Sequence, residues 1–281
     1  MTIALSGSSG FVGHYLHTYF SSKNFEIILI NRDDFDNKVI LTHKIQIADV
    51  IINLVGANVL GRWSQSYKDE LYNSRIECTK KIVDAINECN NTDKLLLSTS
   101  AIGIYSNNVI NDEENFTYGD TFLSHICKNW EKEANRAKCR VIISRFGVVL
   151  GDGGALSKML TPFKLGIGGK IADGLQAFSY VHINDLARAY LFYMENKHLE
   201  GVFNLCTPNS INNAKLTLSL SQVLDRPAIL PIPSFVLKLM FAEGACILTQ
   251  GQNVYPTRLL ESGFKFEFET IEAILLNLLK S

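Results

Sequence analysis

Three glycines near the start of the chain, Gly7, Gly10 and Gly13, have the spacing of a loop that holds a phosphate group. Such a loop needs glycine for a tight turn, for close approach of the backbone to a pyrophosphate, and for close packing of helix on strand. An apolar run, 3–6, precedes it and a helical segment, 14–21, follows, so a helix N-terminus would offer N–H donors to an anion. The pattern predicts dinucleotide binding, and a glycine turn without a ligand is the alternative. The expected contacts are Gly7, Ser8, Ser9, Gly10, Phe11, Val12 and Gly13.

Four polar residues, Asn31, Arg32, Asp33 and Asp34, stand where the next apolar run, 26–31, would reach its tip. An acidic residue at this place hydrogen-bonds the ribose 2′-hydroxyl of NAD. Arg32 beside Asn31 instead matches a 2′-phosphate, which a guanidinium binds through two parallel hydrogen bonds. The sequence therefore favours NADP, with Asn31 and Arg32 as contacts. NAD held by Asp33 or Asp34 is the alternative, and a solvated turn is the third interpretation.

Short apolar runs alternate with longer segments of helical period, which is typical of a parallel sheet wrapped by helices. Strands are expected at 3–6, 26–31, 50–55, 94–100, 140–146 and 202–205, and helices at 66–87 and 122–137. The last part of the chain reads as mostly helical, with 264–268 as an alternating strand. The prediction is an α/β fold: a Rossmann-type doubly wound parallel sheet over 1–205, followed by a small, mainly helical C-terminal lobe over 206–281 that closes over the site.

Charge and cysteine content limit the classes of partner. Lys and Arg number 27 against 28 Asp and Glu, and the formal charge is −1. Binding to nucleic acid or to an anionic membrane needs concentrated basic residues, so neither is expected as a partner. The six cysteines lie far apart without a Cys-x-x-Cys pair, and no group of residues has the spacing of metal ligands. With no signal-peptide pattern at the N-terminus, the expectation is a cytoplasmic protein with reduced thiols and no metal.

Together with the glycine loop, several motifs carry a resemblance to the extended and atypical short-chain dehydrogenase/reductase superfamily. They are Asn-Leu-Val-Gly-Ala-Asn at 53–58, Ser-Thr-Ser-Ala-Ile-Gly-Ile-Tyr at 98–105, Arg-Trp-Ser at 62–64 with Lys68 and Ser74-Arg75, Trp130-Glu131, the glycine-rich stretch 147–155, Phe-Ser-Tyr-Val-His-Ile-Asn-Asp at 178–185, and the stretches 228–233 and 259–264. More narrowly, the chain resembles NAD(P)-dependent epimerase-like proteins with a small C-terminal domain of unknown function. The resemblance spans the whole chain.

The resemblance implies a Rossmann-type fold that binds NADP(H). Because ligands bind outside the carboxyl ends of parallel strands, further cofactor contacts are expected from Leu54, Val55, Gly56, Ala57 and Ser98. Ser100 stands at the place of the superfamily's serine or threonine, which hydrogen-bonds the substrate, so it is a predicted catalytic residue. Arg145 and Gln176 are expected polar contacts, and the glycine-rich loop 166–174 is expected to cover the cofactor.

The superfamily's acid/base pair, Tyr-x-x-x-Lys, is absent from the helix that should carry it. In that pair a lysine cation lowers the pKa of the phenol from about 10 toward the working pH. In the register set by Glu131, Leu123 stands at the tyrosine place and Cys127 at the lysine place. A shift of one residue brings Ser124 and Lys128 there instead, and neither frame holds a tyrosine.

Tyr105, which follows Ser100 by five residues, is the first candidate to replace the missing tyrosine, and a packing aromatic is its alternative role. Further candidates are Tyr118, His125 and Lys128. His182 lies three residues before Asp185, an offset that suits a capping or structural hydrogen bond better than a catalytic one.

Two functions fit these features. The first is an NADP(H)-dependent oxidoreductase or epimerase that acts on a small polar substrate, with sugars among the candidates. The second is a non-catalytic NADP(H)-binding regulatory or sensor protein, which the missing acid/base pair favours. A homodimer is compatible with the helices 66–87 and 122–137, although an apolar stripe facing the sheet explains them without a partner.

Overall fold

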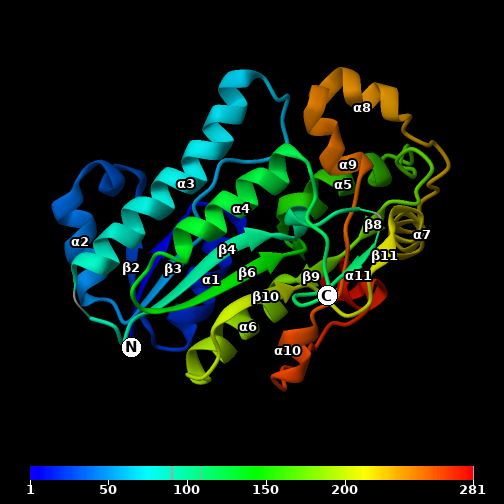
Figure 1. Cartoon of the computed structure of the whole chain (residues 1–281). Helices are drawn as coiled ribbons and strands as arrows, with labels where there is room; N and C mark the ends of the chain where they lie inside the picture. Colours follow the sequence, from blue (N-terminus) through cyan, green and yellow to red (C-terminus); the bar gives the residue numbers. More distant parts are fainter. Residues whose placement is uncertain (90, 108, 281) are drawn as a thin grey trace.

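The computed structural model describes residues 1–89, 91–107 and 109–280. Within them a six-stranded parallel sheet forms the centre of the molecule, in the order β10-β6-β4-β3-β1-β2 (Figure 1). Its strands are β1 (Thr2–Ser6), β2 (Glu26–Ile30), β3 (Val50–Asn53), β4 (Leu95–Ala101), β6 (Arg140–Phe146) and β10 (Gly201–Leu205). All six predicted sheet strands are confirmed, with small shifts at their ends.

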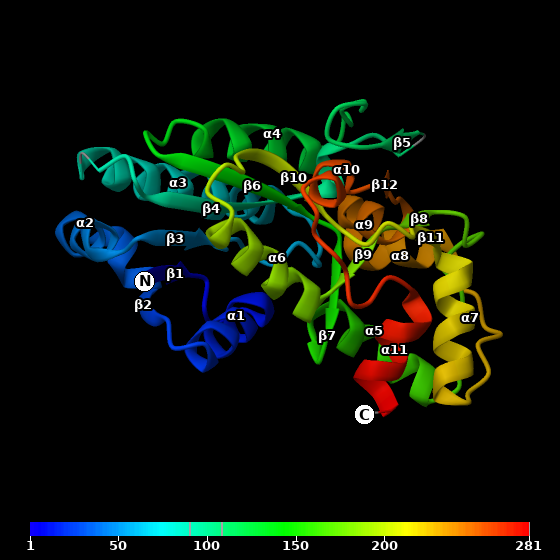
Figure 2. The ribbon, with the colours of Figure 1, turned by 90° about the horizontal axis from the view of Figure 1, so that it is seen from below.

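Helices cover both faces of the sheet because both faces are apolar. The helices concerned are α1 (Phe11–Ser22), α2 (Lys38–Ile47), α3 (Gln65–Glu88), α4 (Phe122–Ala134) and α6 (Ile183–Glu195). Successive strand residues point to opposite faces, so Ile3 and Leu5 pack with α1 and α6, whereas Ala4 packs with α2, α3 and α4. Figure 2 shows α1 and α6 on one side of the sheet and α3 and α4 on the other. The doubly wound arrangement predicted from the sequence is confirmed.

The strand order reverses at β1. The chain passes from β1 to β2 on one side and then returns to β3 on the other, so the carboxyl ends of β1 and β3 lie next to each other. Ser6 and Asn53 are paired there, and the Ser6 hydroxyl lies 3.1 Å from Oδ1 of Asn53. Ligands of doubly wound sheets bind at such a switch point. The topology therefore places a candidate site beside the glycine loop.

A second, smaller core joins the C-terminal part to the segment between β6 and α6. Leu156, Phe163 and Tyr180 pack there with Leu216 and Ile274. The division of the chain at 205/206 stays a prediction, and this core draws residues from both sides of it.

The remaining elements are η1 (Arg32–Asp36), η2 (Ile102–Ile104), β5 (Ile110–Asn111), β7 (Val148–Gly151), α5 (Gly154–Lys164), β8 (Ala177–Phe178), β9 (Tyr180–His182), β11 (Ile211–Asn212), α7 (Asn213–Leu224), α8 (Ser234–Phe241), η3 (Ala242–Ala245), α9 (Cys246–Thr249), β12 (Asn253–Val254), α10 (Thr257–Glu261) and α11 (Ile271–Lys280).

The strand expected over 264–268 is wrong. The backbone N–H groups of Glu267 and Phe268 both donate to the carboxylate of Asp185, each at 2.9 Å, instead of to a neighbouring strand. Phe264 and Phe266 are buried in the core beneath α6. The alternation in this segment therefore reflects side chains packing on one side of an extended segment outside any sheet.

None of the described helices is long and apolar enough to cross a membrane.

Candidate functional site

The glycine loop connects β1 to α1, and its geometry excludes side chains at two positions. Gly7 has a φ of 74°, and a Cβ there would lie 2.9 Å from the carbonyl oxygen of Leu54. A Cβ at Gly13 would lie 2.1 Å from the carbonyl oxygen of Gly7. The N–H of Gly10 donates to Gly7 at 3.1 Å and closes the turn. Among the described residues no side chain caps the start of α1, so its first N–H groups keep the donors that helix N-termini offer to phosphates.

The other residues of the glycine loop are either exposed at the turn or packed against the protein. Ser8 is partly exposed and Ser9 is exposed at the turn, whereas Val12 packs against the core under α1. The ring of Phe11 lies against the turn between β7 and α5, where a Cβ on any of its three glycines would meet the ring at 2.7 Å. These glycines are Gly151, Gly153 and Gly154. Their lack of side chains lets the 147–155 motif pack directly on the phosphate loop.

At the tip of β2, the acidic and basic residues have different surroundings. The buried carboxylate of Asp34 accepts hydrogen bonds from the backbone N–H of Asn31 and from Nζ of Lys44, both at 2.6 Å. Asn31, Arg32 and Asp33 are exposed, and no described residue accepts a hydrogen bond from Arg32. Asp34 is therefore occupied by structural contacts, which leaves Arg32 and Asp33 as the charged groups open to a ligand.

Helix α3 holds the loop after β3, Leu54 to Ala57, through hydrogen bonds to both backbone polar groups of Ala57. The N–H of Ala57 donates to the hydroxyl of Ser74 at 2.9 Å, and its carbonyl accepts from Nη2 of Arg75 at 2.9 Å. Gly56 is exposed, and Leu54 and Val55 are partly buried. Since the Leu54 carbonyl lies against Gly7, this clamp also fixes the distance between the two loops at the switch point.

Ser100 ends β4 inside a buried polar network. Its hydroxyl donates to Glu131 Oε1 of α4 at 2.7 Å. Arg145 of β6 binds the same carboxylate through Nε at 2.8 Å and Nη2 at 2.7 Å, and only 3% of Arg145 is exposed. In this arrangement the Arg145 guanidinium is engaged with protein groups rather than free to contact a cofactor. Ser98, two residues earlier in β4, is also buried within the sheet.

Tyr105 belongs to the same network. Its hydroxyl donates to Oδ1 of Asn204 at 2.7 Å and accepts from Nη1 of Arg145 at 2.6 Å, and 1% of the residue is exposed. Burial raises the pKa of Tyr105 to about 12, against the lowering influence of the Arg145 cation. The phenol is therefore neutral at physiological pH and fully hydrogen-bonded. These contacts support the packing alternative, and the catalytic role of Tyr105 stays a prediction.

Replacing Tyr105 by Phe separates these two roles. The change removes both hydrogen bonds and leaves Asn204 and Arg145 short of a partner, so we expect a loss of about 1–3 kcal/mol in the free energy of unfolding. NADPH affinity should stay unchanged. Urea denaturation and fluorescence titration of NADPH measure the two quantities. Loss of turnover in a variant as stable as the wild type would instead support the catalytic role.

The start of α4 confirms that no tyrosine stands in the expected place. Leu123 packs in an apolar cluster around Trp63, and Cys127 is buried, with a pKa raised to about 11 by burial. Of the other candidates, Lys128 donates to the Gly119 carbonyl at 3.2 Å and stands over the ring of Tyr118. His125 is exposed beside Asp120.

Two other predicted residues have structural contacts. Nδ1 of His182 accepts from the N–H of Asn184 at 3.1 Å and caps α6, which confirms its structural role. Gln176 donates to the carbonyls of Ile171 and Leu248 at 3.3 and 3.0 Å. The loop 166–174 packs against the segment 228–233, since a Cβ at Gly169 would lie 2.0 Å from the Leu230 carbonyl oxygen. Its expected place over a cofactor stays a prediction.

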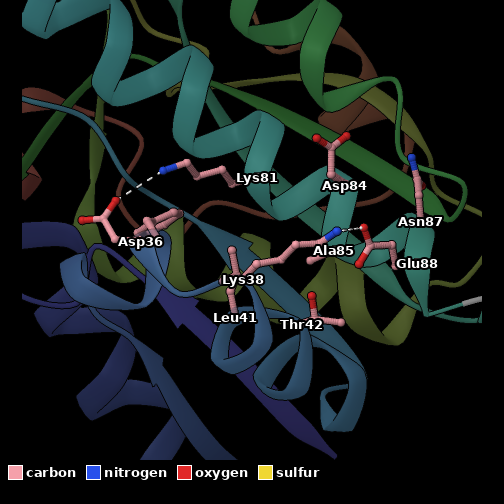
Figure 3. Close-up of a pocket in the computed structure, with 10 residues that line it drawn as sticks. Asp36, Lys38, Leu41, Thr42, Lys81, Asp84, Ala85, Asn87 and Glu88 are labelled. Carbon is pink, nitrogen blue, oxygen red and sulfur yellow. Dashed lines mark hydrogen bonds and ion pairs between the residues drawn. The ribbon is translucent and has the colours of Figure 1, made fainter.

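A groove of about 560 Å³ lies between η1, α2 and α3 (Figure 3). It is crossed by the ion pairs Asp36–Lys81 and Lys38–Glu88, at 3.4 and 2.5 Å. None of the cofactor or catalytic residues predicted from the sequence lines it. The described residues also contain no group of three His, Cys, Asp or Glu side chains that could hold a metal ion.

Sequence reasoning missed the roles of Glu131, Asn204 and the Ser74–Arg75 clamp. These residues come from separate elements and meet only in the folded chain. Ser74, Arg75 and Glu131 stood within recognised motifs, but the motifs carried no sign of their hydrogen-bond partners. Asn204 had no signal at all, because an asparagine inside a strand is uninformative without its neighbours.

Comparisons with known proteins agree with this geometry. Residues 3–206 match the NAD dependent epimerase/dehydratase family, and residues 232–278 match a domain of unknown function, DUF1731. The epimerase family protein SDR39U1 homolog, chloroplastic, of Arabidopsis thaliana is 34% identical over 98% of this chain and 86% of its own length. The crystal structure of human epimerase family protein SDR39U1 (isoform 2) with NADPH has a TM-score of 0.91 at 31% identity, covering 100% of both chains. UDP-glucose 4-epimerase from Thermotoga maritima, with a TM-score of 0.80 at 16% identity over 100% of this chain and 98% of its own, shares the fold.

These matches confirm the resemblance drawn from the motifs, because they cover the sheet, the glycine loop and the C-terminal lobe. The chain belongs to the NAD-dependent epimerase/dehydratase family, with a C-terminal domain of the DUF1731 type.

Proposed function

We propose that this chain binds NADP(H) and acts as an oxidoreductase or epimerase-like protein on a small polar substrate, with sugars among the candidates. The observation that carries the proposal is the pairing of the glycine loop at the switch point with an exposed, unpartnered Arg32 at the tip of β2. The NADPH in the crystal structure of human SDR39U1 supports the choice of NADP over NAD.

Within this proposal, the position of each residue determines which part of the cofactor it contacts. The N–H groups at the start of α1 hold the pyrophosphate, and Asn31 and Arg32 hold the adenosine end through the 2′-phosphate. Gly56 and Ala57 allow the backbone to approach the nicotinamide half, and Ser98 and Ser100 lie on β4 beyond them. When bound, the nicotinamide ring would supply or accept the hydride. In the register set by Glu131, Leu123 and Cys127 stand in place of the usual pair, so Tyr105 or water would move the proton.

A second function, an NADP(H)-binding regulator without catalysis, is favoured by one specific observation. In the register set by Glu131, Leu123 and the buried thiol of Cys127 stand at the places of the acid and its lysine, and the Tyr105 hydroxyl is hydrogen-bonded to Asn204 and Arg145. The register shifted by one residue, with Ser124 and Lys128, offers no tyrosine either. Both functions require the cofactor. They differ only in turnover.

The test is a titration followed by an activity screen. We expect fluorescence titration to give micromolar affinity for NADPH and weaker affinity for NADH. The absorbance of bound NADPH is then followed with a panel of sugars, aldehydes and ketones. Oxidation of NADPH by one of them, or epimerisation of one of the sugars seen by NMR, supports the enzyme. Tight binding with neither reaction on any of them favours the regulator. If neither nucleotide binds, both functions are wrong.

Three further expectations belong to the proposal. A cytoplasmic location rests on the six cysteines, all free in the structure, although the Arabidopsis relative is named as chloroplastic. A small-molecule substrate, rather than nucleic acid or membrane, follows from the scattered charges. A homodimer through α3 and α4 stays compatible with the fold, and light scattering at micromolar concentration would decide it.

A further inference from the structure

The guanidinium of Arg75 lies behind the loop that follows β3. It stands between Gly56, where a Cβ would lie 3.0 Å from Cζ of Arg75, and the ring of Trp130 on α4, whose centroid is 5.4 Å from Cζ. Nη2 donates to the carbonyl of Ala57 at 2.9 Å, and Nη1 donates to the carbonyl of Leu71 at 3.0 Å. The side chain is thus held in one place by two backbone oxygens and one aromatic face.

No acidic residue neutralises this cation. Among the described residues, no Asp or Glu forms an ion pair with Arg75, and two of its five N–H groups have acceptors. Arg145 has the opposite setting, because Glu131 of α4 binds it at 2.7 Å. Burial lowers the pKa of Arg75 without any carboxylate to offset the effect. A partly buried charge without a counter-ion is costly, so its position calls for a negatively polarised ligand.

The position is also near the place of the missing lysine. Arg75 packs on Trp130 of α4, three residues after Cys127, and Cys127 stands at the lysine place in the register set by Glu131. In the strand order, the loop after β3 lies between the glycine loop of β1 and the end of β4. A dinucleotide that begins at Arg32, beyond the tip of β2, therefore reaches this loop with its nicotinamide half.

We propose that Arg75 binds the nicotinamide half of the cofactor. Its free N–H groups and positive charge meet the hydroxyls of the nicotinamide ribose, in place of a lysine from α4. Ser74, the neighbouring residue on α3, is the positioning partner, because it holds the N–H side of Ala57. The inference rests on the proposed function, since it needs NADP(H) in the site.

The experiment compares whole and half ligands. NADPH carries the nicotinamide riboside, whereas 2′,5′-ADP carries only the adenosine half with the 2′-phosphate. Arg75→Met removes the charge but keeps most of the side-chain volume, and Arg75→Lys keeps the charge with fewer donors. We expect Arg75→Met to weaken NADPH binding about tenfold or more, Arg75→Lys to fall between it and the wild type, and both variants to keep the wild-type affinity for 2′,5′-ADP.

Two controls make the result specific. Arg136→Met removes a surface arginine that pairs with Glu133 and Asp84, and it should change neither affinity. Ser74→Ala loosens the same loop without removing charge, so it should weaken NADPH binding less than Arg75→Met does and leave 2′,5′-ADP binding unchanged. Circular dichroism confirms folding of each variant, and Arg75→Lys carries the test if Arg75→Met does not fold.

The inference is overturned if a folded Arg75 variant binds NADPH as the wild type does. It is also overturned if Ser74→Ala weakens NADPH binding as much as Arg75→Met does, because Arg75 would then only hold the loop. Equal losses for NADPH and 2′,5′-ADP overturn it as well, because Arg75 would then not act on the nicotinamide half. Failure of the wild type to bind either ligand is a different result, since it contradicts the proposed function itself.

Discussion

Replacing Glu131 by Gln should lower the free energy of unfolding by about 3–5 kcal/mol. The carboxylate neutralises Arg145, which is 3% exposed, and accepts the hydroxyl proton of Ser100. An amide at this place leaves the guanidinium buried without a counter-ion. Its NH2 group replaces one acceptor oxygen and faces other hydrogen-bond donors. Unfolding in urea, followed by circular dichroism, measures the change.

Glu133→Gln on the same helix is the matched control. Glu133 pairs with Arg136, but that arginine side chain is 43% exposed, so water screens the pair. The expected loss is within about 1 kcal/mol. A loss of that small size for Glu131→Gln as well would contradict the buried network. Because the same carboxylate holds both Ser100 and Arg145, turnover of any identified substrate by Glu131→Gln should fall together with stability.

Replacing Arg32 by Ala should weaken NADPH binding about ten- to a hundredfold while the affinity for NADH stays the same. Arg32 is exposed at the tip of β2 and has no acceptor among the described residues, so its donors are free for a 2′-phosphate. NADH lacks this phosphate and gains nothing from the guanidinium. Parallel fluorescence titrations with the two nucleotides, at one fixed salt concentration, measure the ratio.

Asp33→Ala decides between the two cofactors. If the exposed carboxylate of Asp33 binds the ribose 2′-hydroxyl, the variant loses affinity for NADH, and the preference for NADP is wrong. If Arg32 determines the choice, the removal of a nearby negative charge improves NADPH binding slightly. Equal losses for both nucleotides in Arg32→Ala would show that the residue holds the loop rather than the phosphate.

The parts of this protein that depend on local patterns could be predicted from the sequence. All six strands of the central sheet were found, because strands buried on both faces leave continuous apolar runs. The glycine loop was found because its turn excludes side chains at Gly7 and Gly13 whatever else the chain does. The same reasoning failed at 264–268, where the alternation of Phe264 and Phe266 does not reveal that Asp185 takes the backbone N–H groups.

The candidate site itself was decided by the tertiary structure. The distance of Tyr105 from Ser100 along the chain makes it a candidate, but whether its hydroxyl is free depends on Asn204, which is 99 residues away. In the same way, Glu131 accepts from Ser100 and Arg145, and Arg75 has no such acid, although the sequence presents both arginines alike. The type of a residue determines which hydrogen bonds and charges its side chain can offer. Only the packing of distant segments decides which of them are already satisfied and which remain for a ligand.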